Sequence, residues 1–154
     1  MIMKRMVSVF AAVMLAVSAF CAGHSWNDDI FGCRLGVSTV EDVKKAVEKA
    51  HRTFEPTDDE GSFIAYDALL HGLFYEAVTF NFKNGVLEDV SYIHTQGGLI
   101  DQYNLTVEAL EESHGRGTHF TMDNASMVDW QTEKLRVNIV LDGYDYVMVL
   151  FAKP

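Results

Sequence analysis

The chain has 154 residues, with 12 Lys and Arg against 22 Asp and Glu, so its net charge at pH 7 is −10. Nucleic acid and anionic membrane surfaces repel such a chain and are excluded as expected partners. The length suits one domain with its own hydrophobic core, and two cysteines are too few for a disulfide framework.

The first 23 residues have the pattern of a secretory signal peptide. Lys4 and Arg5 precede an uncharged, mostly apolar run from Met6 to Phe20, and small residues follow. This run is shorter than the roughly 20 residues of a membrane-spanning helix, so no transmembrane anchor is expected. Small residues at the required positions predict cleavage after Cys21 or Gly23. The mature chain would then be exported to the periplasm or secreted, with a net charge near −12.

Cys21 also allows a minority alternative, in which it is the lipidated first residue of a lipoprotein. Bacterial lipoprotein signals favour a small residue before that cysteine, and here it is Phe20. Cys33 is expected either to be buried as a small apolar residue or to form an intermolecular bridge.

The first predicted helix begins after Gly36, within residues 31–50. Ser38 and Glu41 match the S-x-x-E capping box, so Ser38 is the expected N-cap. A valine stripe then recurs at spacings of three and four and faces the core. The same glycines and serine do not form a phosphate loop, because no lysine precedes a Ser/Thr pair, and G-x-S-x-G is absent.

Residues 62–95 read as strands. One strand is expected within residues 62–69, and residues 78–83 alternate between apolar and polar side chains. Asn84 and Gly85 form the strongest short hairpin signal, because a type I′ turn needs positive φ at both positions. Residues 86–93 supply the next strand.

The second predicted helix runs from Leu99 to about His114, and Gly115 is expected to end it in the left-handed conformation. Three strands follow, in "SMVDWQ", "KLRVNIVL" and "YVMVLFA". The order is helix, three strands, helix, three strands, with pseudo-repeat halves at about 31–95 and 99–154. We therefore expect one α+β domain over residues 24–154, an antiparallel sheet with both helices on one face and the other face open.

No catalytic or metal-binding motif is found, so a non-enzymatic protein without a cofactor is expected. Glu111, His114 and His119 have some of the spacing of a carboxylate–histidine metal helix, but the second pair and further ligands that such a site needs are absent. The acidic run from Asp58 to Glu60 lacks the alternating spacing of a calcium loop. The rival hypothesis is a small extracytoplasmic hydrolase that pairs Asp129 with His94 or His119.

The favoured function is binding of another envelope or secreted protein through the open sheet face. Aromatic residues with a polar tip carry much of the energy at protein interfaces. The candidate binding residues are Tyr75, Tyr92, Trp130, Tyr144 and Tyr146, and Tyr66 belongs to the same set of strand-region aromatics.

Two segments resemble a known superfamily. "FGCRLGVSTVEDVKKAVEKA" and "YEAVTFNFKNGVLEDVSY" are similar to the helix start and hairpin of the β-lactamase-inhibitor-like superfamily, which includes the SmpA/OmlA outer-membrane assembly lipoproteins. The matching positions are Gly36, Ser38, Asp42 and Val43 in the helix, and Tyr75, Val78, Phe80, Phe82, Gly85 and Leu87 in the hairpin. The resemblance is strongest over residues 31–95 and implies a non-enzymatic exported module that binds proteins through a concave sheet. A looser similarity is to PepSY-type modules.

Overall fold

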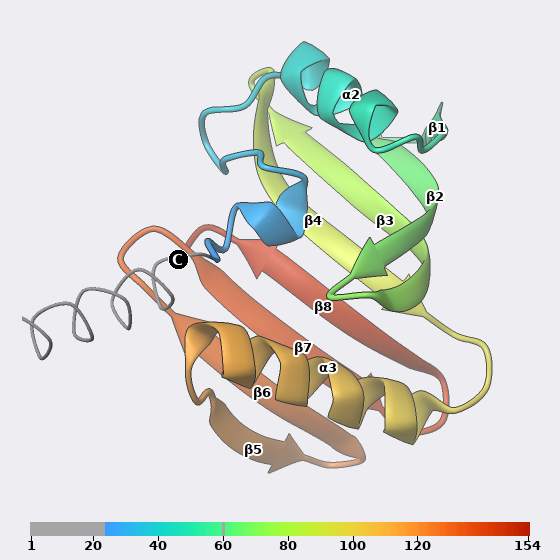
Figure 1. The fold of residues 1–154 in the computed structure, drawn as a ribbon, viewed down its shortest axis with the longest axis vertical. Coiled ribbons are helices and arrows are strands. Elements are labelled where there is room, and N and C mark those ends of the chain that lie inside the picture. Colours follow the sequence, from blue (N-terminus) through green and yellow to red (C-terminus); the bar gives the residue numbers. More distant parts are fainter. Residues whose placement is uncertain (1–23, 60) are drawn as a thin grey trace, which may run out of the picture.

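The computed structural model describes residues 24–59 and 61–154. The predicted signal peptide, both cleavage sites, Cys21 and Glu60 lie outside these ranges. The described chain folds as one antiparallel sheet of eight strands, with two α-helices and a short 3₁₀ helix (Figure 1). Among the described residues, no helix has both the length and the apolar character needed to cross a membrane.

The elements follow one another as two runs of a helix and four strands. The first run contains η1 (Asp28–Ile30), α2 (Val40–Lys49), β1 (Phe54–Pro56), β2 (Phe63–Leu70), β3 (Leu73–Lys83) and β4 (Val86–His94). The second contains α3 (Leu99–His114), β5 (Thr118–Met122), β6 (Ala125–Gln131), β7 (Arg136–Asp142) and β8 (Tyr146–Ala152). The strand order across the sheet is β1-β2-β3-β4-β8-β7-β6-β5, so the two runs join where β4 pairs with β8.

The expected arrangement of two helix-plus-three-strand halves is wrong, because the eight-stranded sheet dominates a mostly β protein. The two strands that the sequence did not reveal, β1 and β5, are the edges of the sheet. The three residues of β1 are half-buried or exposed and all five residues of β5 are exposed, so neither shows the apolar alternation that marks a half-buried strand.

The core lies between the sheet and the two helices. Val43 and Val47 of α2 and Val107 and Leu110 of α3 pack into the same cluster as the inward side chains of the strands. Figure 1 shows α2 and α3 on the same face of the sheet, with the segment that carries η1 between them. Ile30 and Cys33 of this segment are buried in that core, which is the first of the two alternatives for Cys33.

The helix start lies one residue later than predicted. Thr39, not Ser38, is the N-cap of α2, and its hydroxyl accepts a hydrogen bond from Asp42 N while the Asp42 carboxylate accepts one from Thr39 N. Ser38 instead accepts a hydrogen bond from Arg34 N, and the Ser38 carbonyl accepts one from Leu87 N. Ser38 is therefore bound to the preceding loop and to β4, which leaves the next hydroxyl to cap the helix.

Two turns use positive φ angles at both central residues. Asn84 and Gly85 have φ of 53° and 78° and join β3 to β4, which confirms the predicted hairpin. His71 and Gly72 have φ of 51° and 78° and join β2 to β3, a turn that the sequence analysis did not identify. Gly115 follows α3 with φ of 89° but ψ of 170°, so the helix does not end in the predicted left-handed conformation.

Candidate metal centre

Four titratable side chains from three distant segments meet at one point of the helix-covered face. His24 and Asp29 come from the N-terminal segment, His71 from the turn between β2 and β3, and His114 from the last residue of α3. One ligand atom from each of these four lies within 4.8 Å of the other three. We call this group the His/Asp cluster.

The Asp29 carboxylate is the centre of the cluster. Its Oδ1 lies 2.7 Å from His24 Nε2 and 2.8 Å from His71 Nε2, and its Oδ2 lies 2.8 Å from His114 Nε2. Only 2% of the Asp29 side chain is exposed, so the carboxylate depends on these three rings for its interactions.

The charge state of Asp29 follows from two opposing effects. Burial alone would raise the pKa of this carboxyl group, but the contacts with His114, His71 and His24 outweigh it and hold the pKa well below its usual range. Asp29 is therefore an anion at neutral pH. Tyr92 fixes the backbone at this position, because its buried hydroxyl donates a 2.6 Å hydrogen bond to the Asp29 carbonyl.

His71 is held in an unusual way. A non-glycine residue with positive φ is uncommon, although histidine tolerates it better than most, and here it directs an imidazole ring toward the cluster. His71 Nε2 is 2.8 Å from Asp29 Oδ1, yet the two atoms lack the alignment of a hydrogen bond, so this buried nitrogen is left unsatisfied. A buried nitrogen without a hydrogen-bond partner, facing a carboxylate and two other imidazoles, is placed to coordinate a cation.

His114 is positioned by an aromatic stack. The centroids of the Trp26 and His114 rings are 3.4 Å apart, and the angle between the ring planes is 9°. His114 is also the last residue of α3, so its backbone is fixed by the helix. The His114 side chain is 4% exposed, and its Nε2 faces Asp29.

The contacts of the cluster can be compared with the ligand spacing of a four-coordinate metal site. With bonds of about 2.1 Å, ligand atoms around a tetrahedral ion are roughly 3.4 Å apart. The nitrogen–oxygen contacts of 2.7 to 2.8 Å in the cluster would thus open by roughly 0.6 Å around an ion.

The ligand types select the class of metal. Calcium and magnesium prefer oxygen ligands, whereas three imidazole nitrogens and one carboxylate suit zinc, copper or nickel. Two further contacts orient the candidate ligands: Ser113 Oγ lies 3.4 Å from the other ring nitrogen of His71, and the Tyr92 hydroxyl binds the Asp29 carbonyl.

The three metal residues considered from the sequence do not form one site in the structure. Glu111 Oε1 pairs with His119 Nε2 at 2.6 Å and accepts a hydrogen bond from Gly117 N, while His114 turns to Asp29. Of the acidic run, Asp58 and Asp59 are exposed in a loop, and Glu60 lies outside the described residues.

The predicted hydrolase pairs do not form among the described residues. Asp129 accepts a hydrogen bond from Arg136 Nε at 3.0 Å, and His119 is engaged by Glu111. His94 lies 3.1 Å from the Gly97 carbonyl oxygen through Nε2 and 3.6 Å from Glu76 through Nδ1. No histidine therefore meets Asp129 within hydrogen-bond reach.

Three of the five aromatic binding candidates do not lie on the open face. Tyr75, Tyr92 and Trp130 are buried on the helix-covered face, where their polar atoms bind Thr106 Oγ1, the Asp29 carbonyl and the Gly115 carbonyl. A buried tyrosine or tryptophan needs a hydrogen-bond partner for its polar atom. Each of the three has one beneath the helices, so burial leaves no polar atom unsatisfied. Tyr144 is 93% exposed in the turn between β7 and β8, and Tyr146 is half-buried at the start of β8.

The open face instead carries a continuous apolar row. Strand pairing aligns seven residues across it, in the order Tyr66, Ala77, Ile93, Met148, Val140, Met127 and Phe120. Their neighbours along the strands, such as Tyr92 and Val149, point into the core, so the row faces the other way.

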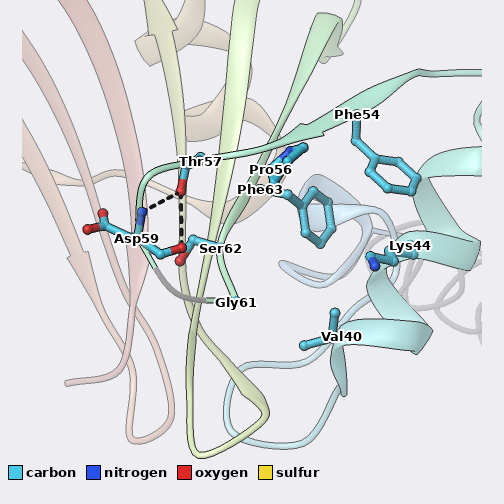
Figure 2. Close-up of a pocket in the computed structure, with 9 residues that line it drawn as sticks. All are labelled: Val40, Lys44, Phe54, Pro56, Thr57, Asp59, Gly61, Ser62 and Phe63. Atoms are coloured by element: carbon cyan, nitrogen blue, oxygen red, sulfur yellow. Dashed lines mark hydrogen bonds between the residues drawn. The ribbon is translucent and has the colours of Figure 1, made fainter.

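A surface pocket of about 330 Å³ lies between α2 and the β1–β2 region (Figure 2). Phe54, Phe63 and Val40 form apolar walls, Lys44 lies across from Thr57 and Asp59, and no histidine lines it. Three other surface pockets, of about 300 to 510 Å³, also have no residue of the His/Asp cluster in their lining.

Sequence reasoning missed the cluster because its members are separated by 5, 42 and 43 positions and have no motif spacing. One signal was available: "LLHGL" places a histidine before glycine between two apolar runs, a turn position that usually carries Asn or Asp.

No family model, curated protein or solved structure matches the chain. The resemblance to the β-lactamase-inhibitor-like superfamily therefore stays a prediction.

Proposed function

We propose that the protein is an exported metal-binding protein that holds one divalent transition-metal ion in the His/Asp cluster. One observation carries the proposal: three imidazole nitrogens and a buried carboxylate oxygen from three separate segments lie within 4.8 Å of one another. Imidazole nitrogens and a carboxylate oxygen that converge from separate segments are the ligand set of transition-metal sites.

The proposed role is binding without catalysis. A catalytic metal site keeps an open coordination position beside a substrate cleft. None of the four pockets described above is lined by a residue of the cluster, and four protein ligands would fill the coordination shell of a tetrahedral ion.

Export is compatible with this site. Both predicted cleavage positions, after Cys21 and after Gly23, precede His24, so the mature chain would keep all four ligands. The acidic chain also attracts cations electrostatically.

The direct test is calorimetric titration of the metal-free protein with Zn²⁺. We expect one ion to bind, and we expect Asp29→Asn and His71→Asn to weaken binding by more than about a hundredfold, since changes even to outer-shell partners cost 10- to 100-fold. Asparagine is chosen for His71 because it also tolerates positive φ, so the turn is preserved while the imidazole is lost.

His119→Asn is the matched control. His119 also contacts a carboxylate, Glu111, but lies outside the cluster and is about half exposed. Its loss should leave zinc affinity unchanged, with circular dichroism confirming that all variants are folded. Equal loss of affinity in the His119 and His71 variants would contradict the assignment of the site.

A second candidate function is binding of another exported protein through the open sheet face. The apolar row across seven strands favours it, because a continuous apolar surface on a soluble protein marks an interaction site. This candidate keeps the surface expected from the sequence but replaces its buried tyrosines and tryptophan with the residues of the row.

A further inference from the structure

We infer that His24 is an exchangeable ligand, through which the ion enters and leaves while Asp29, His71 and His114 remain in place. This inference rests on the proposed metal function and deepens it: the cluster is then a site of metal uptake and hand-over, not a permanently closed structural site.

Three of the ligands are fixed by the surrounding fold. The exposed fractions of the Asp29, His114 and His71 side chains are 2%, 4% and 13%. Asp29 is held by Tyr92 through its backbone carbonyl, and His114 by the end of α3 and the Trp26 stack. His71 occupies a two-residue turn whose backbone leaves little freedom.

His24 differs in each of these respects. Its side chain is 38% exposed, and within the described part of the chain its one side-chain hydrogen bond is the one to Asp29. It stands outside any helix or strand and precedes the first turn of the N-terminal segment. Its ring touches the others by tilted contacts, with centroids 4.7 Å from His71 and 5.1 Å from His114.

The predicted processing adds to this freedom. Cleavage after Cys21 or Gly23 would make His24 the third or the first residue of the mature chain. A residue so near a chain end is restrained by few backbone neighbours, so its ring can leave the site without opening the core.

Departure of His24 has a defined chemical result. An ion left on Asp29, His71 and His114 has one open position, facing the solvent side from which His24 withdrew. Three protein ligands and one exchangeable position allow a nitrogen ligand from another molecule to bind before the ion is released. Free imidazole offers the same nitrogen donor as His24 and would fill this position in its place, without taking the ion away.

The test measures the rate at which Zn²⁺ passes from the loaded protein to an excess of a chromophoric chelator. Wild type is compared with His24→Ala, His114→Ala and His119→Ala, each with and without added imidazole. His24→Ala should still bind one ion but release it at least about tenfold faster, and imidazole should slow that release by filling the vacant position.

His114→Ala should bind Zn²⁺ poorly, and imidazole should not change its release rate, because the position that His114 leaves is buried. His119→Ala should release Zn²⁺ at the wild-type rate. Release from His24→Ala at the wild-type rate would overturn the inference, as would complete loss of binding in a folded His24→Ala protein. If wild type itself binds no Zn²⁺, the proposed function fails. If wild type binds Zn²⁺ but His24→Ala releases it at the wild-type rate or does not bind it at all, only the exchange role of His24 fails.

Discussion

At the scale of single residues, His71 satisfies two demands that seldom coincide. Its backbone adopts the positive φ required by the turn between β2 and β3, and its ring completes the His/Asp cluster. Asparagine or aspartate is the common choice for such a turn. A histidine there is better explained by what its side chain binds than by the turn alone, which ties a backbone observation to function.

The start of α2 gives a stability prediction at the same scale. Thr39→Ala should lower the free energy of unfolding by about 1 kcal/mol, because the helix loses its N-cap hydroxyl and half of the capping box. Ser38→Ala is the control and should cost less, since it removes one exposed loop hydrogen bond. Urea unfolding of both variants provides the measurement, and a larger loss for Ser38→Ala would show that the cap is assigned to the wrong residue.

At the scale of elements, the sheet presents two different faces along the same strands. On β4, Tyr92 points into the core and Ile93 points outward, and the same alternation continues into β8 with Val149 and Met148. The helices cover one face, so a partner that binds a face of the sheet would meet the other one, where the apolar row lies.

The role of this row can be tested with charge substitutions on the open face. Met148→Glu and Met127→Glu place a carboxylate in the row and should abolish retention of a specific exported partner, because the charge would be buried without a counterion. Ser91→Glu adds the same charge to the same face in the neighbouring row and should leave retention intact. Affinity capture from exported proteins, followed by binding measurements with the purified partner, distinguishes these outcomes; equal behaviour of all three variants would remove the row from consideration.

At the scale of the whole molecule, the His/Asp cluster joins parts of the chain that the sheet does not join directly. It links the N-terminal segment to a turn of the first run of strands and to the helix of the second. A ligand that binds only the folded state stabilises it by mass action, and a site built from three distant segments cannot persist in the unfolded chain.

Zinc should therefore raise the thermal stability of the protein. At a free Zn²⁺ concentration 100 times the dissociation constant, the expected gain is about 2.7 kcal/mol, a rise of several degrees in the melting temperature. Asp29→Asn binds more than about a hundredfold more weakly, so the same Zn²⁺ concentration should stabilise it by no more than about 0.4 kcal/mol. Scanning calorimetry in the presence of Zn²⁺ or of a chelator measures both values, and an identical zinc response in wild type and Asp29→Asn would place the ion elsewhere.

Local sequence patterns determined the elements whose causes are local. The α3 helix, the Asn84–Gly85 turn and the alternating strands were predictable, because a periodic apolar face and a turn with positive φ each depend on a few neighbouring residues. Ser38 was misassigned as the cap because two adjacent hydroxyls satisfy the same pattern, and contact with β4 chose between them.

Tertiary structure alone decided the edges of the sheet, the burial of Tyr75, Tyr92 and Trp130, and the site. Edge strands bury little and so leave a weak pattern, and a tyrosine or tryptophan on a strand suits a core or a surface until its polar atom finds a partner. Three histidines and an aspartate spread between positions 24 and 114 have no common spacing. They become a site because the fold brings the N-terminal segment, the turn at His71 and the end of α3 to one point, which is a long-range property that no local pattern encodes.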